Sequence, residues 1–267
     1  MSATEVEEIS DARREELAEA LTLVRRKVEL ACVNRPPDRS PPCLVAVSKN
    51  KPASDIRACH DLGQIDFGEN YLNELVVKAS TLPESIRWHF IGTLQSNKCK
   101  AIAAIPNLYC LHTLDSAKKA DTLQKALHLA RKEPLKVMIQ INTSEEESKS
   151  GLQPIPPQNS ETSEVVTLAR HIIKACPMLE LHGLMTIGSL GASMSEAENP
   201  DFQRLISTRD ALCGILNQDC DLGDAWSSTK TLALSMGMSA DFEEAIRAGS
   251  DVIRVGTGIF GSRFARA

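Results

Sequence analysis

Leu44-Val45-Ala46-Val47-Ser48-Lys49 is a short, continuously apolar run that ends in a lysine. Runs of this kind are typical of parallel strands that are buried on both faces. Near the other end of the chain, Val252-Ile253-Arg254-Val255-Gly256-Thr257-Gly258 has the same character and leads into a small-residue loop suited to phosphate. If these two runs are the first and last strands of a closed barrel, they are neighbours. The lysine, the arginine and the glycine loop then belong to one site.

Between these two runs, apolar segments alternate with helical patterns. We predict strands over Cys43–Ser48, Ile65–Gly68, Trp88–Ile91, Leu108–His112, Val137–Asn142, Leu181–Thr186, Leu232–Ser235 and Val252–Gly256. We predict helices over Pro52–Leu62, Asn70–Ser80, Asn97–Ala104, Ser116–Lys132, Ser163–Ala175, Asp201–Asn217 and Asp241–Ala248. Eight βα units in one chain favour an α/β fold of the (β/α)8 TIM-barrel type. A doubly wound open sheet is the alternative, although no G-x-G-x-x-G motif follows the first strand.

An additional helix precedes the barrel. Ser10 or Asp11 can cap it, and its apolar stripe consists of Leu17, Leu21, Val24 and Val28. A proline-rich break follows before residue 43. We therefore divide a single domain of residues 1–267 into an N-terminal helix and loop (1–42) and a barrel (43–263).

Three polar segments are expected to be surface loops: Gln153–Thr162, Gly191–Pro200 and Gln218–Lys230. The last contains Asp219, Asp221 and Asp224, and we expect it to be a mobile insertion. Its role is not evident from the sequence.

The composition of the 267 residues is that of an ordinary globular protein, with 42% hydrophobic residues, 24% charged residues and a formal net charge of −5. This balance argues against a nucleic-acid-binding surface, and no apolar run is long enough to span a membrane. The first residues are acidic and do not resemble a signal peptide. We expect a cytoplasmic protein, and a nuclear or mitochondrial pool is left open.

Eight cysteines are scattered along the chain without a Cys-x-x-Cys pair. Cys110-Leu111-His112 offers two metal ligands but has no matching second pair. We therefore expect buried, reduced thiols and no metal site. His89, inside an apolar strand, is expected to be a hydrogen-bonded core residue.

The strand ends contain few groups that could act as acids or bases. No Ser–His–Asp set, zinc-binding helix motif, Walker loop or catalytic carboxylate pair is present. A desolvated lysine is a nucleophile toward carbonyls, so Lys49, with Arg254 and a hydroxyl-rich loop, suggests a ligand with an aldehyde and a phosphate. Each residue also has a structural alternative: Lys49 can simply extend to solvent, Arg254 can pair with a carboxylate, and Ser239 or Asp241 can cap a helix.

The motifs resemble those of the pyridoxal phosphate homeostasis protein family. They run in order from residue 44 to residue 263 and include Val47-Ser48-Lys49-x-Lys51-Pro52, Phe67-Gly68-Glu69-Asn70-Tyr71, Trp88-His89-Phe90-Ile91-Gly92, Leu234-Ser235-Met236-Gly237-Met238-Ser239 and Arg254-Val255-Gly256-Thr257. The resemblance implies a barrel like the N-terminal domain of alanine racemase that holds pyridoxal 5′-phosphate (PLP) as a Schiff base. It implies that Lys49 binds the cofactor, that Arg254 faces the pyridine nitrogen, and that Asn70 lies near the cofactor. The residues implied at the phosphate are Ser235, Met238, Ser239, Gly256 and Thr257.

An arginine at the pyridine nitrogen makes the ring a weak electron sink, and no base is evident for the opposite face of the ring. We therefore expect a monomeric PLP carrier that buffers the cofactor or delivers it to apo-enzymes, with no catalytic residue. A PLP-dependent amino-acid racemase and a PLP-independent Schiff-base lyase acting on a sugar phosphate are the alternatives.

Overall fold

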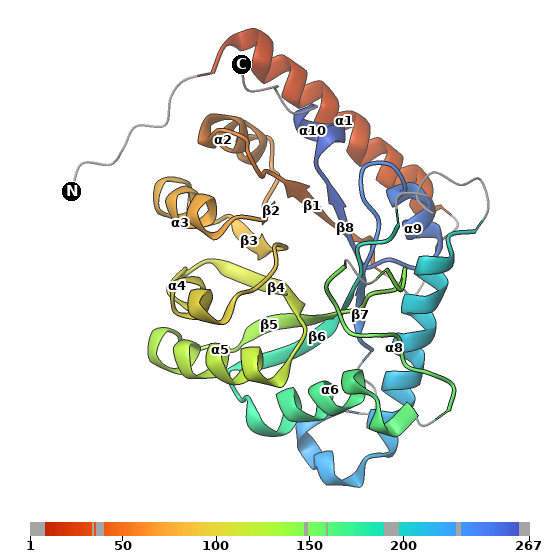
Figure 1. The fold of residues 1–267 in the computed structure, drawn as a ribbon. Coiled ribbons are helices and arrows are strands. Elements are labelled where there is room, and N and C mark those ends of the chain that lie inside the picture. Colours follow the sequence, from red (N-terminus) through yellow and green to blue (C-terminus); the bar gives the residue numbers. More distant parts are fainter. Residues whose placement is uncertain are drawn as a thin grey trace.

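The barrel predicted from the sequence is confirmed in the computed structural model, which describes residues 9–33, 35, 40–146, 149–158, 160–189, 198–227 and 231–261. Its eight parallel strands pair in chain order, and β8 closes the sheet by pairing with β1 (Figure 1). The strands are β1 (Cys43–Val47), β2 (Asp66–Glu69), β3 (Arg87–Phe90), β4 (Leu108–Leu114), β5 (Leu135–Gln140), β6 (Leu179–Met185), β7 (Ala233–Ser235) and β8 (Val252–Val255).

Helices cover the outside of the sheet (Figure 1). The α-helices of the described part are α1 (Asp11–Cys32), α2 (Ala53–Asp61), α3 (Leu72–Thr81), α4 (Cys99–Ala103), α5 (Ala117–Ala130), α6 (Glu164–Ala175), α8 (Pro200–Gln218), α9 (Phe242–Arg247) and α10 (Thr257–Phe260). Short 3-10 helices are η1 (Ser96–Lys98), η2 (Ser160–Thr162) and η3 (Cys220–Ala225). Of the α-helices in the described part, α10, a single turn, is the one without a counterpart among the predicted helices. No helix in the described ranges combines the length and apolarity that crossing a membrane requires.

The apolar core has two parts, one on each side of the sheet. The larger part fills the space between the strands and the helices, and a small cluster of Val45, Cys110, Met138, Met185 and Val252 fills the barrel interior. Val45 of β1 is paired in register with Arg254 of β8. Because alternate residues of a strand face the same side, Arg254 shares the interior face with Val252, as its position in the strand predicts.

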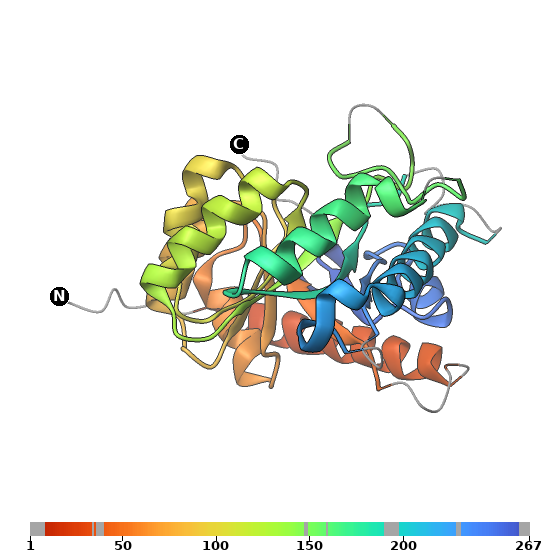
Figure 2. The same ribbon diagram turned by 90° about the horizontal axis from the view of Figure 1, so that it is seen from below.

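Helix α1 covers the junction where the first and last strands meet. It packs against α2, α9 and α10, and Figures 1 and 2 show it lying along one side of the barrel. The Ser10 hydroxyl caps it by accepting a hydrogen bond from the Arg13 amide at 3.3 Å. The predicted stripe is buried. Arg13 then links the helix to the barrel through Asp55 at 2.7 Å.

The structure corrects the expectation for the acidic segment Gln218–Lys230. Its described part contains η3, and Asp219 accepts a hydrogen bond from Arg170 of α6 at 2.6 Å. Trp226 is buried and its indole donates to Asn217 at 2.8 Å. Residues 218–227 are therefore docked against the barrel helices and do not form a free loop, while 228–230 lie outside the described residues. Most of Gly191–Pro200 also lies outside them.

Candidate functional site

A cavity of about 380 Å³ opens at the carboxyl ends of the strands. Its walls come from β1, β6, β8 and the loops that follow the strands. The lining residues are Val47, Lys49, Asn70, Ile91, Met185, Ile187, Met238, Ser239, Ala240, Arg254, Gly256 and Thr257. Barrel enzymes and ligand-binding barrels place their sites at this mouth, and the volume suits a small organic ligand.

Lys49 lies in the turn directly after β1, and a buried charged cluster holds this turn in place. Ser48 donates its hydroxyl hydrogen to Glu69 at 2.6 Å. Lys78 of α3 donates to Glu69 at 2.7 Å and to the Ser48 carbonyl at 2.9 Å. Burial raises the pKa of Glu69, and the neighbouring Lys78 ammonium opposes that rise. The turn continues through Asn50 in the left-handed region, with φ of 59°. These contacts direct the Lys49 side chain into the cavity.

Arg254 reaches the same cavity from the barrel interior. Its guanidinium donates to the Ser235 hydroxyl at 2.6 Å and to the Thr186 carbonyl at 2.7 Å. Burial lowers its pKa to about 10, which leaves the group fully protonated at neutral pH. Among the described residues, no carboxylate forms an ion pair with it. The arginine is therefore a buried cation whose only hydrogen-bonding capacity is to donate.

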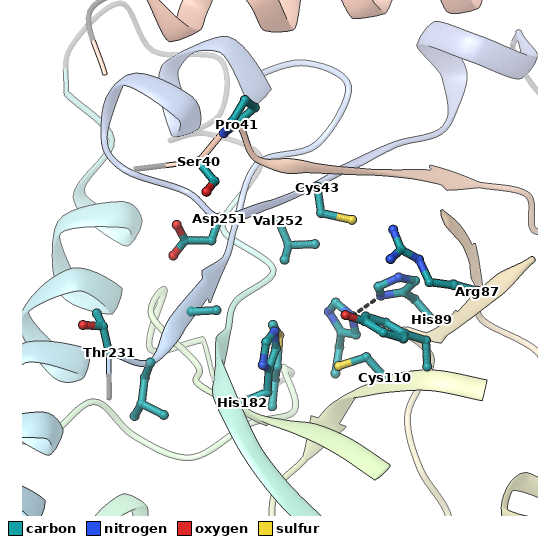
Figure 3. Close-up of a pocket in the computed structure, with 15 residues that line it drawn as sticks. Ser40, Pro41, Cys43, Arg87, His89, Cys110, His182, Thr231, Asp251 and Val252 are labelled. Carbon is teal, nitrogen blue, oxygen red and sulfur yellow. Dashed lines mark hydrogen bonds between the residues drawn. The ribbon is translucent and has the colours of Figure 1, made fainter. Parts of the chain in front are cut away.

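Four hydrogen bonds connect Arg254 to Asp66 through the barrel interior. Arg254 donates to Ser235, which contacts His112 Nδ1 at 3.1 Å. His112 Nε2 lies 2.9 Å from His89 Nδ1 (dashed line in Figure 3). His89 Nε2 lies 2.9 Å from Asp66. Arg254 can only donate and an ionised Asp66 can only accept, so with neutral histidines a single proton arrangement satisfies every bond. Ser235 then donates to His112, His112 donates to His89, and both histidines are neutral with the proton on Nε2.

The loop after β7 approaches the loop after β8 on one side of the cavity. Ser239 accepts a hydrogen bond from the Gly256 amide at 3.1 Å, and Asp241 accepts one from the Met238 amide at 2.6 Å. Gly237 has φ of 93°, and a Cβ there would lie 2.5 Å from the Ala245 Cβ. Only glycine fits this turn. The two loops present the Ser239 and Thr257 side chains at the cavity wall.

Asn70 follows β2 and contributes to the wall nearest Lys49's turn. Its side-chain oxygen Oδ1 is buried and has no hydrogen-bond partner. The backbone of Asn70 packs directly against Gly92. A Cβ at position 92 would lie 1.9 Å from the Asn70 carbonyl oxygen, so no side chain fits there. An unpartnered buried oxygen beside a cavity costs free energy unless a ligand or water satisfies it.

The structure brings together all the site residues that the sequence analysis names except Ser235. Ser235 is fully buried beneath Arg254 and does not line the cavity. Its hydroxyl accepts a hydrogen bond from Arg254 and so supports the arginine, while the phosphate contact implied for Ser235 stays a prediction. The sequence analysis missed Thr186 as a partner of Arg254 and Ile187 as a wall residue. Both follow directly after Met185 at the end of β6, and residues at the carboxyl end of a barrel strand are expected at the mouth, which was a usable signal.

A closed (β/α)8 barrel with a lysine after its first strand and a buried arginine on its last strand defines a class: the barrels that resemble the N-terminal domain of alanine racemase. The sequence profile of the family "Alanine racemase, N-terminal domain" matches residues 37–264. The pyridoxal phosphate homeostasis protein of Homo sapiens is 46% identical over 252 residues, covering 91% of this chain and 86% of the human protein. That of Haemophilus influenzae is 40% identical over 247 residues and covers 91% and 94%. The chain belongs to the pyridoxal phosphate homeostasis protein family.

Solved structures agree with this assignment. PipY of Synechococcus elongatus, solved with PLP bound, superposes with a TM-score of 0.68 at 28% identity, covering 92% of this chain and all of PipY (100%). Alanine racemase from Corynebacterium glutamicum superposes with a TM-score of 0.63 at 17% identity, covering 94% of this chain and 62% of the racemase. The racemase match shows the shared barrel fold.

Proposed function

We propose that this chain binds PLP as a Schiff base on Lys49 and serves PLP homeostasis by buffering the cofactor or delivering it. One observation carries the proposal: Lys49, Arg254, Ser239 and Thr257 line one cavity. When bound, PLP supplies an aldehyde and an electron-accepting ring. The cavity offers a group of suitable chemistry for each part of that molecule, so the residues fit the cofactor.

Each residue has a defined part in binding. The Lys49 amine would condense with the aldehyde carbon, forming a C=N bond and releasing one water. Arg254 would donate a hydrogen bond to the pyridine nitrogen, and the unpartnered oxygen of Asn70 would gain a polar neighbour. Ser239 and Thr257 would donate hydroxyl hydrogen bonds to the phosphate, assisted by the backbone around Met238 and Gly256.

The same residues argue against efficient catalysis. Arg254 cannot give a proton to the ring nitrogen, so the ring withdraws electrons weakly. Among the described residues that line the cavity, none is a carboxylate, a histidine or a tyrosine that could act as an opposite-face base. Of the two tyrosines, Tyr71 lies in a neighbouring groove, and Tyr109 lies at the opposite mouth with Lys136 2.8 Å from its hydroxyl.

We also propose the setting in which this carrier works. Every one of the eight cysteines is a free thiol in the structure, which suits a reducing compartment such as the cytoplasm. Apo-forms of PLP-dependent enzymes are the recipients that a delivery role requires. We propose that the protein acts on them as a monomer.

The first experiment tests the attachment to Lys49. The purified protein, incubated with PLP and freed of excess, should show the visible absorbance of an imine. Lys49→Ala should lose it, because it removes the only amine we assign to the aldehyde. The matched control is Lys51→Ala, since Lys51 donates to the Phe260 carbonyl at 2.9 Å and does not line the cavity. Absorbance that persists in Lys49→Ala would contradict the proposal.

A PLP-dependent racemase is the second candidate, because the barrel is shared with alanine racemases. Incubation of the PLP-loaded protein with single L-amino acids, followed by chiral chromatography, separates the two functions. We expect no D-isomer above the level formed by free PLP. Rapid D-isomer formation that depends on Lys49 would establish the enzyme instead.

A further inference from the structure

A second and larger cavity lies at the amino ends of the strands, on the opposite side of the barrel from the proposed PLP site. Its volume is about 500 Å³. Figure 3 shows histidine and cysteine side chains from neighbouring strands directed into this cavity. Nothing in the proposed PLP chemistry uses this mouth, although it contains the most concentrated group of metal-ligating side chains in the described part of the chain.

Three of these side chains converge. The ligand atoms of His89, Cys110 and His112 all lie within 4.8 Å of one another, and all three residues are buried. Cys110 and His112 are two positions apart on β4. His89 of β3 is paired in register with Cys110. The sequence discloses only Cys110 and His112; closure of the barrel adds the third ligand.

The surrounding contacts orient these ligands as a metal site requires. His89 directs its Nε2 to Asp66 at 2.9 Å, and His112 directs its Nδ1 to Ser235 at 3.1 Å. Those bonds leave His89 Nδ1 and His112 Nε2 facing each other at 2.9 Å with one proton between them. Metal-bound histidines in proteins usually have their other ring nitrogen bonded in this way to a carboxylate or similar group.

We propose that this mouth binds a divalent transition-metal ion of the zinc type through His89 Nδ1, His112 Nε2 and the Cys110 thiolate. The ion takes the place of the proton between the two rings. That proton moves to His112 Nδ1, which then donates to the Ser235 hydroxyl oxygen, and the Cys110 thiol releases its own proton to solvent. Zinc ligands at about 2.0–2.3 Å require the two nitrogens to separate to roughly 3.3 Å, a movement of a few tenths of an ångström. The fourth position faces the cavity, where water or another ligand can occupy it.

The charges nearby permit a cation. Arg87, which lines the cavity, donates to both oxygens of Asp66, one at 2.8 Å and the other at 2.5 Å. Lys136 donates a hydrogen bond to the Tyr109 hydroxyl.

A second possible set of metal ligands consists of Cys43, Asp66 and His89, and it shares His89 with the first set. We favour the Cys110 set, because the Asp66 carboxylate already binds the Arg87 guanidinium.

Equilibrium dialysis of the full chain against buffered Zn²⁺, followed by metal analysis, tests the site and needs no bound PLP. We expect one zinc per chain. Cys110→Ser and His112→Asn should each weaken binding by at least about tenfold. The matched controls are Cys213→Ser, a half-buried thiol on α8, and Cys43→Ser, a thiol in the same cavity. Both should retain binding.

Circular dichroism identifies a variant that fails to fold, and Cys110→Ala then replaces Cys110→Ser. The absence of stoichiometric zinc binding would overturn the proposal. Zinc binding that is unchanged in both Cys110→Ser and His112→Asn would also overturn it. Loss of binding in Cys43→Ser with retention in Cys110→Ser would show that the assigned ligand set is wrong.

Discussion

At the scale of single residues, the site depends on how one buried cation is accommodated. Arg254 is buried, and its guanidinium donates hydrogen bonds to the Ser235 hydroxyl and the Thr186 carbonyl. These neutral acceptors take the place of a carboxylate. Neutral acceptors leave the full positive charge available to a ligand in the cavity. Taking an arginine out of water is costly unless its donors are paired, so each acceptor behind it matters.

We predict that Ser235→Ala destabilises the protein by about 1–3 kcal/mol, because it removes an acceptor from buried Arg254 and a donor from His112. Urea denaturation of the PLP-free protein measures this cost. Ser80→Ala is the matched control, since the Ser80 hydroxyl is exposed, and it should change stability by less than about 0.5 kcal/mol. An equal, small effect in both variants would show that the Ser235 contact contributes little.

At the scale of elements, α1 belongs to the barrel and is not an appendage. Its apolar stripe packs onto the helices beside β1 and β8, the strands that lead to Lys49 and carry Arg254. The stripe and the Ser10 cap follow from local sequence and are confirmed. The short α10 was missed because one turn has too few residues for a periodic pattern. The docked η3 was missed because a run of acidic residues gives no sign of the Arg170 that pairs with Asp219.

Two leucines of α1 provide a test of this packing. Leu21 is buried at 1% exposure and Leu23 is exposed at 56%, two positions along the same helix. We predict that Leu21→Ala costs about 2–5 kcal/mol, because it leaves a cavity between α1 and the barrel. Leu23→Ala should change stability by less than about 0.5 kcal/mol. Urea unfolding of both variants checks this, and similar losses would contradict the packing described here.

At the scale of the whole molecule, the barrel has two mouths joined by polar contacts through an otherwise apolar interior. The hydrogen-bonded series from Asp66 to Arg254 runs from the amino-end cavity to the proposed PLP site. In the proton arrangement described above, both histidines are neutral. Burial accordingly lowers the pKa of His89, and it lowers that of His112 further below the usual value.

This arrangement predicts how stability depends on pH. The folded protein keeps His89 and His112 neutral, whereas the unfolded chain takes up protons below about pH 6.5. Stability should therefore fall as the pH drops through that value, by at most about 1.4 kcal/mol per pH unit for each histidine. Urea unfolding between pH 7.5 and 5.5, with a chelator present, measures the slope.

His112→Asn should reduce this slope, because one buried histidine no longer differs between the folded and unfolded states. The matched control is His128→Asn on α5, where the side chain is exposed, and it should leave the slope unchanged. A wild-type slope that His112→Asn does not alter would assign the pH dependence to other groups.

The sequence by itself determined the number and order of the βα units, the strand that carries Lys49 and the strand that carries Arg254. These features rest on apolar runs, turn residues and strand periodicity, which are local along the chain. Only the tertiary structure decided that Ser235 supports Arg254, that Asn70 has an unpartnered oxygen at the cavity, and that His89 joins Cys110 and His112. Such contacts join side chains of different strands, and their partners depend on the register between the strands and on side-chain direction within the closed barrel. Local alternation indicates the face on which a side chain lies, but it contains no information on the register that selects its partner.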